Sequence, residues 1–302
     1  MDITAIVCTH NPHAGRFART LDGLRRQTLP PARWDCLVVD NASTPAVGPA
    51  DLPNLRVVRE PRPGLSNARR RGLGQAAGLL CVLVDDDNVL AHDYLEKAIR
   101  IADAHPRIGA FGGRSVPEFE APLADWQREF TTLLAVRDLG AEPLVAPAAG
   151  ALRQYPPCAP IGAGMVLRRD AARVWLDSPP CDLTDRRGSE LTSGGDNDIV
   201  LALCADGWDV AYFPELVLTH LIPSSRLSPD YLARLNEGIQ RSWVRVLSLH
   251  GQRPWPPIAH WTVPIRSARA WIREGAWRGP AQSIRWRGAH GRFLGRADIA
   301  QP

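Results

Sequence analysis

A run of six apolar residues leads directly into three adjacent aspartates, and this stretch constrains the fold more than any other. The residues from Leu79 to Val84 carry no charge, and Asp85, Asp86 and Asp87 follow them. An apolar run of this length is typical of a strand that is buried on both faces, as in a parallel sheet. Three neighbouring carboxylates repel one another unless a hard cation or a proton relieves the repulsion, although they also occur in solvated acidic turns. Because ligands of open α/β sheets bind at the carboxyl ends of the strands, the cluster predicts a metal site.

Strand-like and helix-like segments alternate through residue 90, which predicts a mostly parallel central sheet flanked by helices. Apolar runs mark the strands, and Phe17, Leu21 and Leu24 at helical spacing mark the first helix. A second helix opens near Gly64, with Ser66 as the expected N-cap. The predicted order is a strand over 3–8, a helix over 14–27, strands over 36–39 and 55–58, a helix from 64 onward and the strand over 79–84.

The pattern is weaker in the later part of the chain. Nine prolines lie between Pro117 and Pro180, so we interpret this span as mostly irregular, in the manner of a lid or binding loop. The elements expected after residue 90 are a helix over 93–104, a strand over 108–113 ending in a Gly112-Gly113 turn, a short helix near 123–134, short strands at 164–167, 210–213 and 216–219, and an amphipathic helix over 232–246.

The length fits one large domain or one domain with an appendage, and the composition is ordinary for a globular protein. Of the 302 residues, 45% are hydrophobic and 23% are charged, and no apolar stretch has the length of a membrane span. The N-terminus lacks the basic segment that opens a secretory signal. The six cysteines show no metal-binding spacing, so we expect reduced packing residues of a cytoplasmic protein.

Residues 226–302 form a basic, tryptophan-rich extension that we expect to be helical. This segment holds thirteen arginines against four acids, and six of the ten tryptophans, whereas the first 225 residues are net acidic. The arginines around Trp271, Trp277 and Trp286 fit an interfacial helix on anionic lipid, which would place the protein peripherally at the inner face of the membrane. The alternative is a pair of helices that pack on the main domain with arginine outward. No nucleic-acid-binding module is recognisable.

Several polar residues at the ends of predicted strands and helices have both a structural and a chemical interpretation. Asp40 can cap the turn after its strand or accept the ring N–H of uracil or thymine. Arg69 can belong to a solvated face or bind a base or phosphate. Asp196 and Asp198 can be capping acids at a helix N-terminus, and Asp196 can instead be a general base. His220 can pack, cap or bind a metal through its neutral imidazole.

Five motifs occur in a defined order, and together they resemble the family 2 glycosyltransferases, which have the GT-A fold. The resemblance covers roughly residues 1–225, with a nucleotide-binding half to about 115 and an acceptor half from about 116. The motifs are Cys8-Thr9-His10-Asn11, Val38-Val39-Asp40-Asn41-Ala42-Ser43, Gly64-Leu65-Ser66-Asn67-Ala68-Arg69, Asp85-Asp86-Asp87 and Gly194-Gly195-Asp196-Asn197-Asp198-Ile199.

The resemblance implies a metal-dependent, inverting transfer of a sugar from a nucleoside diphosphate donor to a hydroxyl acceptor. Asp87 in the family's DxD motif would hold Mn²⁺ or Mg²⁺ against the diphosphate, and His220 resembles a histidine that completes the metal site in some members. Asp196 falls on the position of the catalytic base. The implied nucleotide-binding residues are Thr9, Asn11, Asp40, Asn41, Arg69, Asp85 and Asp86. The residues expected on the acceptor side are Gly112, Gly113 and Asp198.

Two positions depart from the family pattern. Gly195 stands where the family often has glutamate before the base, and Arg70 stands where the segment usually has asparagine. The second departure puts the contacts around the nucleotide base in doubt. A uracil or thymine nucleotide is favoured through Asp40, and the acceptor would belong to polysaccharide, glycolipid or glycoconjugate synthesis, with a lipid-linked acceptor included.

Two other functions compete with this interpretation. A non-catalytic scaffold or regulatory subunit that binds sugar nucleotides would also carry the binding motifs, although the presence of both acid sites argues against it. A HAD-type phosphatase would share the strand followed by Asp-x-Asp. Such enzymes also need a downstream lysine, and the only lysine here, Lys97, follows the cluster too closely.

Overall fold

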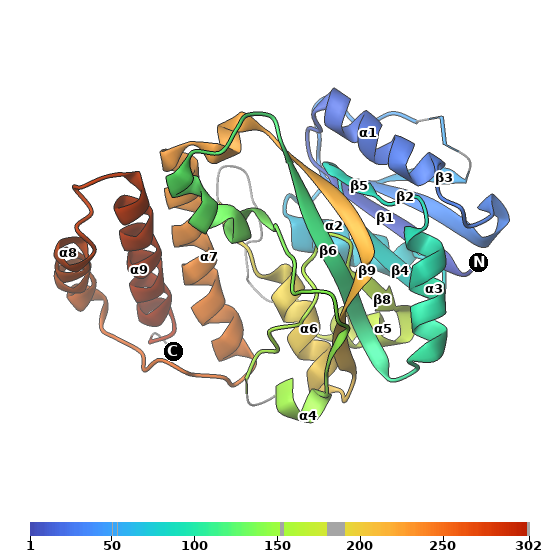
Figure 1. Cartoon of the computed structure of the whole chain (residues 1–302). Coiled ribbons are helices and arrows are strands. Elements are labelled where there is room, and N and C mark those ends of the chain that lie inside the picture. Colours follow the sequence, from blue (N-terminus) through green and yellow to red (C-terminus); the bar gives the residue numbers. More distant parts are fainter. Residues whose placement is uncertain (50, 53, 152–153, 180–190, 301–302) are drawn as a thin grey trace. The chain divides into compact units, whose positions relative to one another are not determined.

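The computed structural model describes residues 1–300 except 50, 53, 152–153 and 180–190 (Figure 1). The chain divides into two compact units. The first comprises residues 1–118, 136–180 and 196–221, and the second comprises 119–135, 181–195 and 222–302. The predicted domain boundary at residue 225 stays a prediction, and residues 119–135, which we assigned to the acceptor half, group with the second unit.

The first unit is built on a sheet whose strands, within the described residues, have the order β3-β2-β1-β4-β8-β6-β9-β5, with β7 paired to β9. Four neighbouring strands are parallel, as the alternating pattern predicts. They are β1 (Ile3–Thr9), β2 (Trp34–Asp40), β3 (Leu55–Arg59) and β4 (Leu80–Asp85). Strand β4 is buried from Leu80 to Val84, which confirms that part of the predicted strand, whereas Leu79 lies before the strand and is 62% exposed.

Apolar residues on both faces of the parallel strands form two separate cores. Alternate β1 residues divide between them, so that Val7 faces one core and Ile6 the other. Helices α1 (Ala14–Arg25) and α3 (Tyr94–Ala104) contribute to the core that contains Val7, and α2 (Leu65–Gln75), α5 (Arg169–Asp177) and α6 (Gly195–Ala205) contribute to the other. Helix α2 begins after Gly64, so Ser66 lies inside the helix and the predicted N-cap is wrong.

The second half of the sheet is antiparallel and more regular than the sequence predicts. It comprises β5 (Asn88–Leu90), β6 (Ile108–Phe119), β7 (Leu144–Ala146), β8 (Val166–Arg168) and β9 (Asp209–Ile222). The predicted Gly112-Gly113 turn is wrong, because β6 continues through both glycines. A Cβ atom at Gly113 would overlap the Leu216 carbonyl oxygen, so glycine permits the close approach of two strand backbones.

Three corrections concern the later elements. The two short strands predicted at 210–219 are one strand, β9, with Pro214 inside it. The proline-rich span contains β7, α4 (Ala148–Ala151) and α5 in addition to the predicted elements, so it is less irregular than expected. The short helix predicted near 123–134 is a 3₁₀-helical segment over Asp125–Leu134.

The second unit contains α7 (Pro229–Leu249), α8 (Val263–Glu274) and α9 (Pro280–Asp298), which confirms the predicted helical extension. Helix α9 packs on both α7 and α8, and Figure 1 shows it between them. Buried glycines let α9 approach α7 closely, since a Cβ at Gly291 would overlap the Glu237 backbone. Ion pairs then join the two helices from Arg241 to Asp298 and from Arg287 to Glu237.

Two further sequence predictions can be compared with the described residues. Five of the six cysteines are buried and free, namely Cys8, Cys36, Cys81, Cys158 and Cys204. The sixth, Cys181, lies outside the described residues. No helix in the described part of the chain has both the length and the apolar character needed to cross a membrane.

Candidate active site

The carboxyl ends of three parallel strands bring the first group of predicted residues together. The register pairs Thr9 at the end of β1 with Asp40 at the end of β2, and Cys8 with Asp85 at the end of β4. The Thr9 hydroxyl is buried and donates a hydrogen bond to the Asp86 carboxylate. The pairing of β1 with β4 and this hydrogen bond therefore hold Asp85 and Asp86 beside the end of β1.

Asp87 lies against His220, as the sequence prediction of a shared site requires. The chain turns after β4 into β5, and antiparallel pairing places Asn88 opposite His220 on β9. The His220 Nε2 atom lies 3.5 Å from the Asp87 Oδ1 atom, and both side chains are buried. The Asn88 side chain donates to the same carboxylate oxygen, and the Leu221 N–H donates to the Asp87 carbonyl.

The Asp87 and His220 side chains form a two-residue donor set of one carboxylate and one imidazole. Among the residues that the structure describes, no group of three or more His, Cys, Asp or Glu side chains has an arrangement that could hold a metal ion. Protein sites that bind Mg²⁺ commonly use one or two carboxylates, with substrate phosphates and water as the other ligands. Asp87 offers one such carboxylate and a neutral His220 imidazole is a common metal ligand, so the pair could hold a cation together with ligands from outside the protein.

Asp40 has the hydrogen bonds of a loop cap. Its carboxylate accepts the backbone N–H groups of Ser43 at 2.9 Å and Val47 at 3.3 Å, and it lies 3.5 Å from the Arg59 guanidinium. Burial opposes ionisation, but the hydrogen bonds from Ser43 and Val47 and the charge of Arg59 outweigh it and lower the Asp40 pKa. The geometry matches the capping interpretation, and a direct contact with a nucleotide base stays a prediction.

A cavity of about 430 Å³ lies on the Asp40 side of the sheet edge. Besides Asp40, its lining residues belong to the following loop and to β3, namely Ala46, Val47, Pro49, Leu55, Val57 and Arg59. None of the aspartates at 85–87 lines it, so this cavity does not join Asp40 to the acidic cluster.

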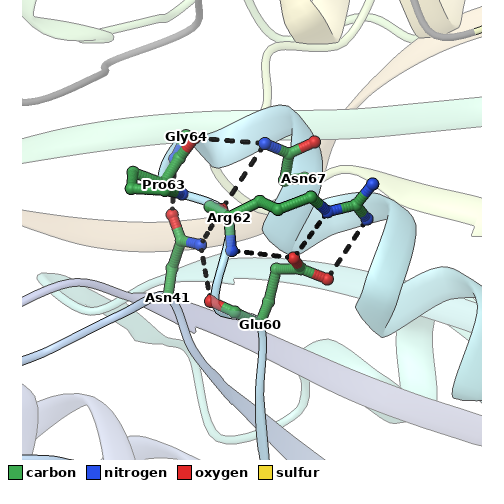
Figure 2. A network of polar contacts seen from close by, with 6 residues as sticks. All are labelled: Asn41, Glu60, Arg62, Pro63, Gly64 and Asn67. Carbon is green, nitrogen blue, oxygen red and sulfur yellow. Dashed lines mark hydrogen bonds and ion pairs between the residues drawn. The ribbon is translucent and has the colours of Figure 1, made fainter.

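Asn41 holds the loop that leads into α2, as Figure 2 shows. Its side-chain amide donates to the carbonyl groups of Glu60 at 3.1 Å and Arg62 at 2.7 Å, while its side-chain oxygen accepts the Gly64 N–H at 2.8 Å. These three bonds use both ends of the amide. Asn41 therefore positions the start of the helix that carries Arg69.

The same loop contains a buried carboxylate that the sequence reasoning missed. Glu60 accepts hydrogen bonds from the Arg62 backbone and guanidinium (Figure 2). The Arg62 side chain is the main cause that lowers the Glu60 pKa, and burial opposes it. Nothing in the sequence marks Glu60 as buried, because a Glu-Pro-Arg-Pro-Gly segment is compatible with any exposed turn.

Asn11 joins the loops after β1 and β2. Its N–H donates to the Ser43 hydroxyl at 2.9 Å, and its side-chain oxygen accepts the Thr44 N–H at 2.8 Å. Asn11 also adopts a positive φ of 49°, which asparagine tolerates better than most residues. These contacts make Asn11 a loop-positioning residue, and its predicted contact with a nucleotide stays a prediction.

Arg69 is buried beside a glycine that the sequence analysis did not single out. A Cβ atom at Gly162 would overlap the Arg69 guanidinium, so glycine at this position leaves room for the arginine. Arg69 also lies within electrostatic range of the Cys8 thiol, as do Asp85 and Asp86. Burial is the main cause that raises the Cys8 pKa to about 12, which keeps the thiol neutral. The loop before β8 that contains Gly162, here called the Gly162 loop, therefore contacts the Arg69 guanidinium.

The Asp196 carboxylate contacts the same loop, although Asp196 and Gly162 are 34 positions apart in the chain. Its carboxylate accepts the Gly162 N–H at 3.0 Å and the Asn197 N–H at 3.0 Å, near the start of α6. The Asp196 charge also acts on Tyr155 and Arg137, where burial is the main cause that raises the Tyr155 pKa and lowers the Arg137 pKa. Gly162 is therefore the shared neighbour of Arg69 and Asp196.

Asp198 is part of the core packing. Its buried carboxylate accepts the Trp175 indole N–H at 2.6 Å, which ties α6 to α5. Arg70 reaches the same region, with its guanidinium 4.3 Å from the Trp175 ring centre and bonded to the Leu176 carbonyl. The predicted acceptor role of Asp198 is untested, and its contacts favour a packing role. Gly112 and Gly113 likewise lie within β6, where they accommodate Pro160 and the β9 backbone.

Comparison with known sequences and structures identifies the family. Residues 4–174 match the sequence profile described as Glycosyl transferase family 2. No curated protein matches the chain. The solved structures with similar folds include the mannosyltransferase PcManGT from Pyrobaculum calidifontis in complex with GDP-Man and Mn²⁺, with a TM-score of 0.57 and 18% identity over 99% of this chain and 86% of that one.

Two more solved structures share the fold at low sequence identity. The S. aureus TarS 1–349 structure in complex with UDP has a TM-score of 0.52 and 15% identity, over 100% of this chain and 92% of that one. The GalNAc-T7 structure with UDP, GalNAc and Mn²⁺ has a TM-score of 0.55 and 14% identity, over 99% of this chain and 56% of that one. These similarities confirm the GT-A fold. With the profile match over more than half of its length, the chain belongs to glycosyl transferase family 2 and is a glycosyltransferase.

Proposed function

We propose that this glycosyltransferase moves a sugar from a nucleoside diphosphate donor to a hydroxyl acceptor with inversion at the sugar carbon, and that a divalent cation is required. The similar structures that hold UDP, GDP-Man and Mn²⁺ support this donor class and cation. The observation that carries the proposal is the Gly162 loop, where the buried Arg69 and the Asp196 carboxylate share one neighbour. Arg69 is also within electrostatic range of the same thiol as Asp85 and Asp86.

Asp87 and His220 are the residues that would hold the cation. Carboxylate oxygen is a ligand of Mn²⁺ and Mg²⁺, neutral imidazole nitrogen is a common metal ligand, and the two side chains are already adjacent. When bound, such a cation stabilises the negative charge that develops on the diphosphate leaving group. The Asn88 amide keeps the Asp87 carboxylate in place by donating to its Oδ1 atom at 3.2 Å.

Asp85, Asp86 and Arg69 would bind the nucleotide. Thr9 orients the Asp86 carboxylate, which leaves the ribose hydroxyls as the natural donors to its remaining lone pairs. The Arg69 guanidinium can donate to a phosphate or to a base carbonyl, because its planar fork suits both. Asn41 and Asn11 support this half indirectly through the loops that they hold.

Asp196 would act as the general base. The Asp196 carboxylate lies near the start of α6, where the backbone N–H groups of Gly162 and Asn197 hold it in place, and a carboxylate can accept a proton. It takes the proton of the acceptor hydroxyl while the hydroxyl oxygen attacks the sugar carbon on the face opposite the diphosphate. The bond to the diphosphate breaks as the new bond forms, so the configuration inverts. The product belongs to polysaccharide, glycolipid or glycoconjugate synthesis.

A calorimetric panel tests the donor proposal. UDP, dTDP, GDP and CMP are titrated into the full chain, each once with Mn²⁺ and once with EDTA. We expect one diphosphate to bind, with higher affinity in the presence of Mn²⁺, and a uracil or thymine nucleotide is favoured. If none of the four binds under either condition, the proposed donor site is wrong.

A further inference from the structure

Helix α8 presents two faces of different character. One face is buried against α9 and carries Val263, Ser267 and Ala270. The opposite side carries large apolar residues that stay exposed in the described structure. We define the α8 outer face as Ile265, Trp271 and Ile272 on the helix together with Trp261 just before it and Trp277 just after it, all between 40% and 75% exposed.

The exposed residues form a continuous stripe because of their spacing. Ile265 and Ile272 lie seven residues apart on α8, so they fall on one line along the helix axis, and Trp261 lies in the 3₁₀ turn (His260–Thr262) just before the helix. The Trp271 and Trp277 rings extend the stripe at the C-terminal end, where their centres are 4.8 Å apart. Contiguous exposed apolar residues of this size mark an interaction site more often than scattered ones do.

Positive charge flanks the outer face. Arg266, Arg269 and Arg273 are exposed on α8, and Arg278 follows with its guanidinium 5.6 Å from the Trp277 ring centre. The only acid on α8 is Glu274, which is paired with Arg273. Positive charge continues on α9. The pKa of Arg296 is lowered there, mainly by burial and also by the charges of Arg266 and Arg292.

This composition selects among the partners that could cover the stripe. A two-fold contact with a second copy would bring the arginines of both copies together, which is electrostatically unfavourable. Anionic phospholipid offers the complementary charge, and its interface favours tryptophan rings and long arginine side chains. A helix that is apolar on its outer line and arginine-rich beside it therefore suits a lipid surface.

We propose that the α8 outer face docks the protein on the surface of an anionic phospholipid membrane. Trp261, Ile265 and Ile272 enter the headgroup region, and Arg266, Arg269 and Arg273 bind the lipid phosphates. The proposal does not depend on the catalytic assignments. Together with the proposed function, it places the transferase beside lipid-linked acceptors.

Vesicle flotation of the full chain tests the docking surface. Phosphatidylcholine vesicles are compared with vesicles that also contain phosphatidylglycerol, at low and high salt. We expect binding to the anionic vesicles, weaker binding to the neutral ones and a loss of binding as salt rises. Failure to float with anionic vesicles at low salt would overturn the proposal.

Two sets of variants locate the surface. Replacing Ile265 and Ile272 by serine should lower the partition coefficient about ten-fold or more, whereas Leu79→Ser with Leu249→Ser, at similarly exposed positions away from α8, should not. Replacing Arg266, Arg269 and Arg273 by glutamine should lower it about a hundred-fold. The charge-matched control changes three exposed arginines elsewhere, namely Arg26, Arg100 and Arg128.

The remaining outcomes are distinguishable. Equal losses in the α8 variants and their controls would assign binding to net charge and overturn the specific surface. Concentration-dependent dimerisation that Ile272→Ser abolishes, without vesicle binding, would show that a second copy covers the face. Nucleotide affinity is measured in every variant, so that failure of the donor site is not mistaken for failure of docking.

Discussion

Asp196 and Asp198 are two residues apart on α6, yet they have different surroundings. Asp196 meets the Gly162 loop, while Asp198 is buried against Trp175. Replacing Asp196 by asparagine should leave nucleotide affinity nearly unchanged and lower the rate of transfer by about 10²–10⁴-fold, since an amide cannot take the acceptor proton. Initial rates of nucleoside diphosphate release with the identified donor and acceptor measure this effect.

Asp198→Asn is the matched control. The variant weakens a charge-assisted hydrogen bond to Trp175, so the free energy of unfolding should fall by about 1–3 kcal/mol. Its transfer rate per folded molecule should stay close to that of the wild type. If Asp198→Asn abolishes transfer in folded protein while Asp196→Asn does not, the assignment of the base is reversed.

At the scale of elements, helix α2 contains two glycines with opposite surroundings. A Cβ at Gly72 would overlap the Ile6 side chain on β1, whereas a Cβ at Gly74 meets nothing within 4 Å. Gly72→Ala should therefore destabilise the fold by about 1–3 kcal/mol through overpacking. Gly74→Ala should stabilise it by about 0.5–1 kcal/mol by restricting the unfolded chain. Chemical denaturation measures both, and equal effects at the two sites would contradict the close packing of α2 on β1.

The same element scale shows what the sequence could predict. The parallel strands were predictable because buried β1, β2 and β4 are almost uninterrupted apolar runs. The antiparallel half was harder, because Gly112-Gly113 in β6 and Pro214 in β9 are ordinary signs of turns. Both strands continue because long-range pairing outweighs local preference, and that pairing is absent from any short window of sequence.

The sequence named the acidic residues of the candidate site but not the contacts that join it to the rest of the fold. The order of motifs pointed to Asp85–Asp87 and Asp196, a separate resemblance pointed to His220, and the structure brings Asp87 to His220. Gly162 lay in a proline-rich span without periodicity, and its importance depends on the Arg69 side chain that packs against it. A contact between residues 93 positions apart has no local sequence signal.

For the whole molecule, two buried carboxylates determine a pH dependence of stability. Hydrogen bonds outweigh burial to lower the Asp40 pKa, and Arg62 lowers the Glu60 pKa, from ordinary values of 3.8 and 4.5. Because the unfolded chain binds these protons more readily, the stabilisation is present above about pH 4.5 and is lost as the pH falls below the ordinary values. Urea denaturation across acid pH should show this loss, with a shallower slope for Asp40→Asn combined with Glu60→Gln. An unchanged slope in the double variant would contradict the assignment.

The central claim is that a cation held by Asp87 and a nucleoside diphosphate bind together at the end of β4. The most direct measurement is the affinity for UDP, or for whichever diphosphate binds most tightly, in wild type and Asp87→Asn, with Mn²⁺ and with EDTA. The exposed Asp103→Asn variant is the control. We predict that Mn²⁺ raises the nucleotide affinity of the wild type about ten-fold or more and that Asp103→Asn retains this gain. Asp87→Asn should lose the gain, while its affinity in EDTA should equal that of the wild type. The same Mn²⁺ gain in Asp87→Asn as in wild type would contradict the claim.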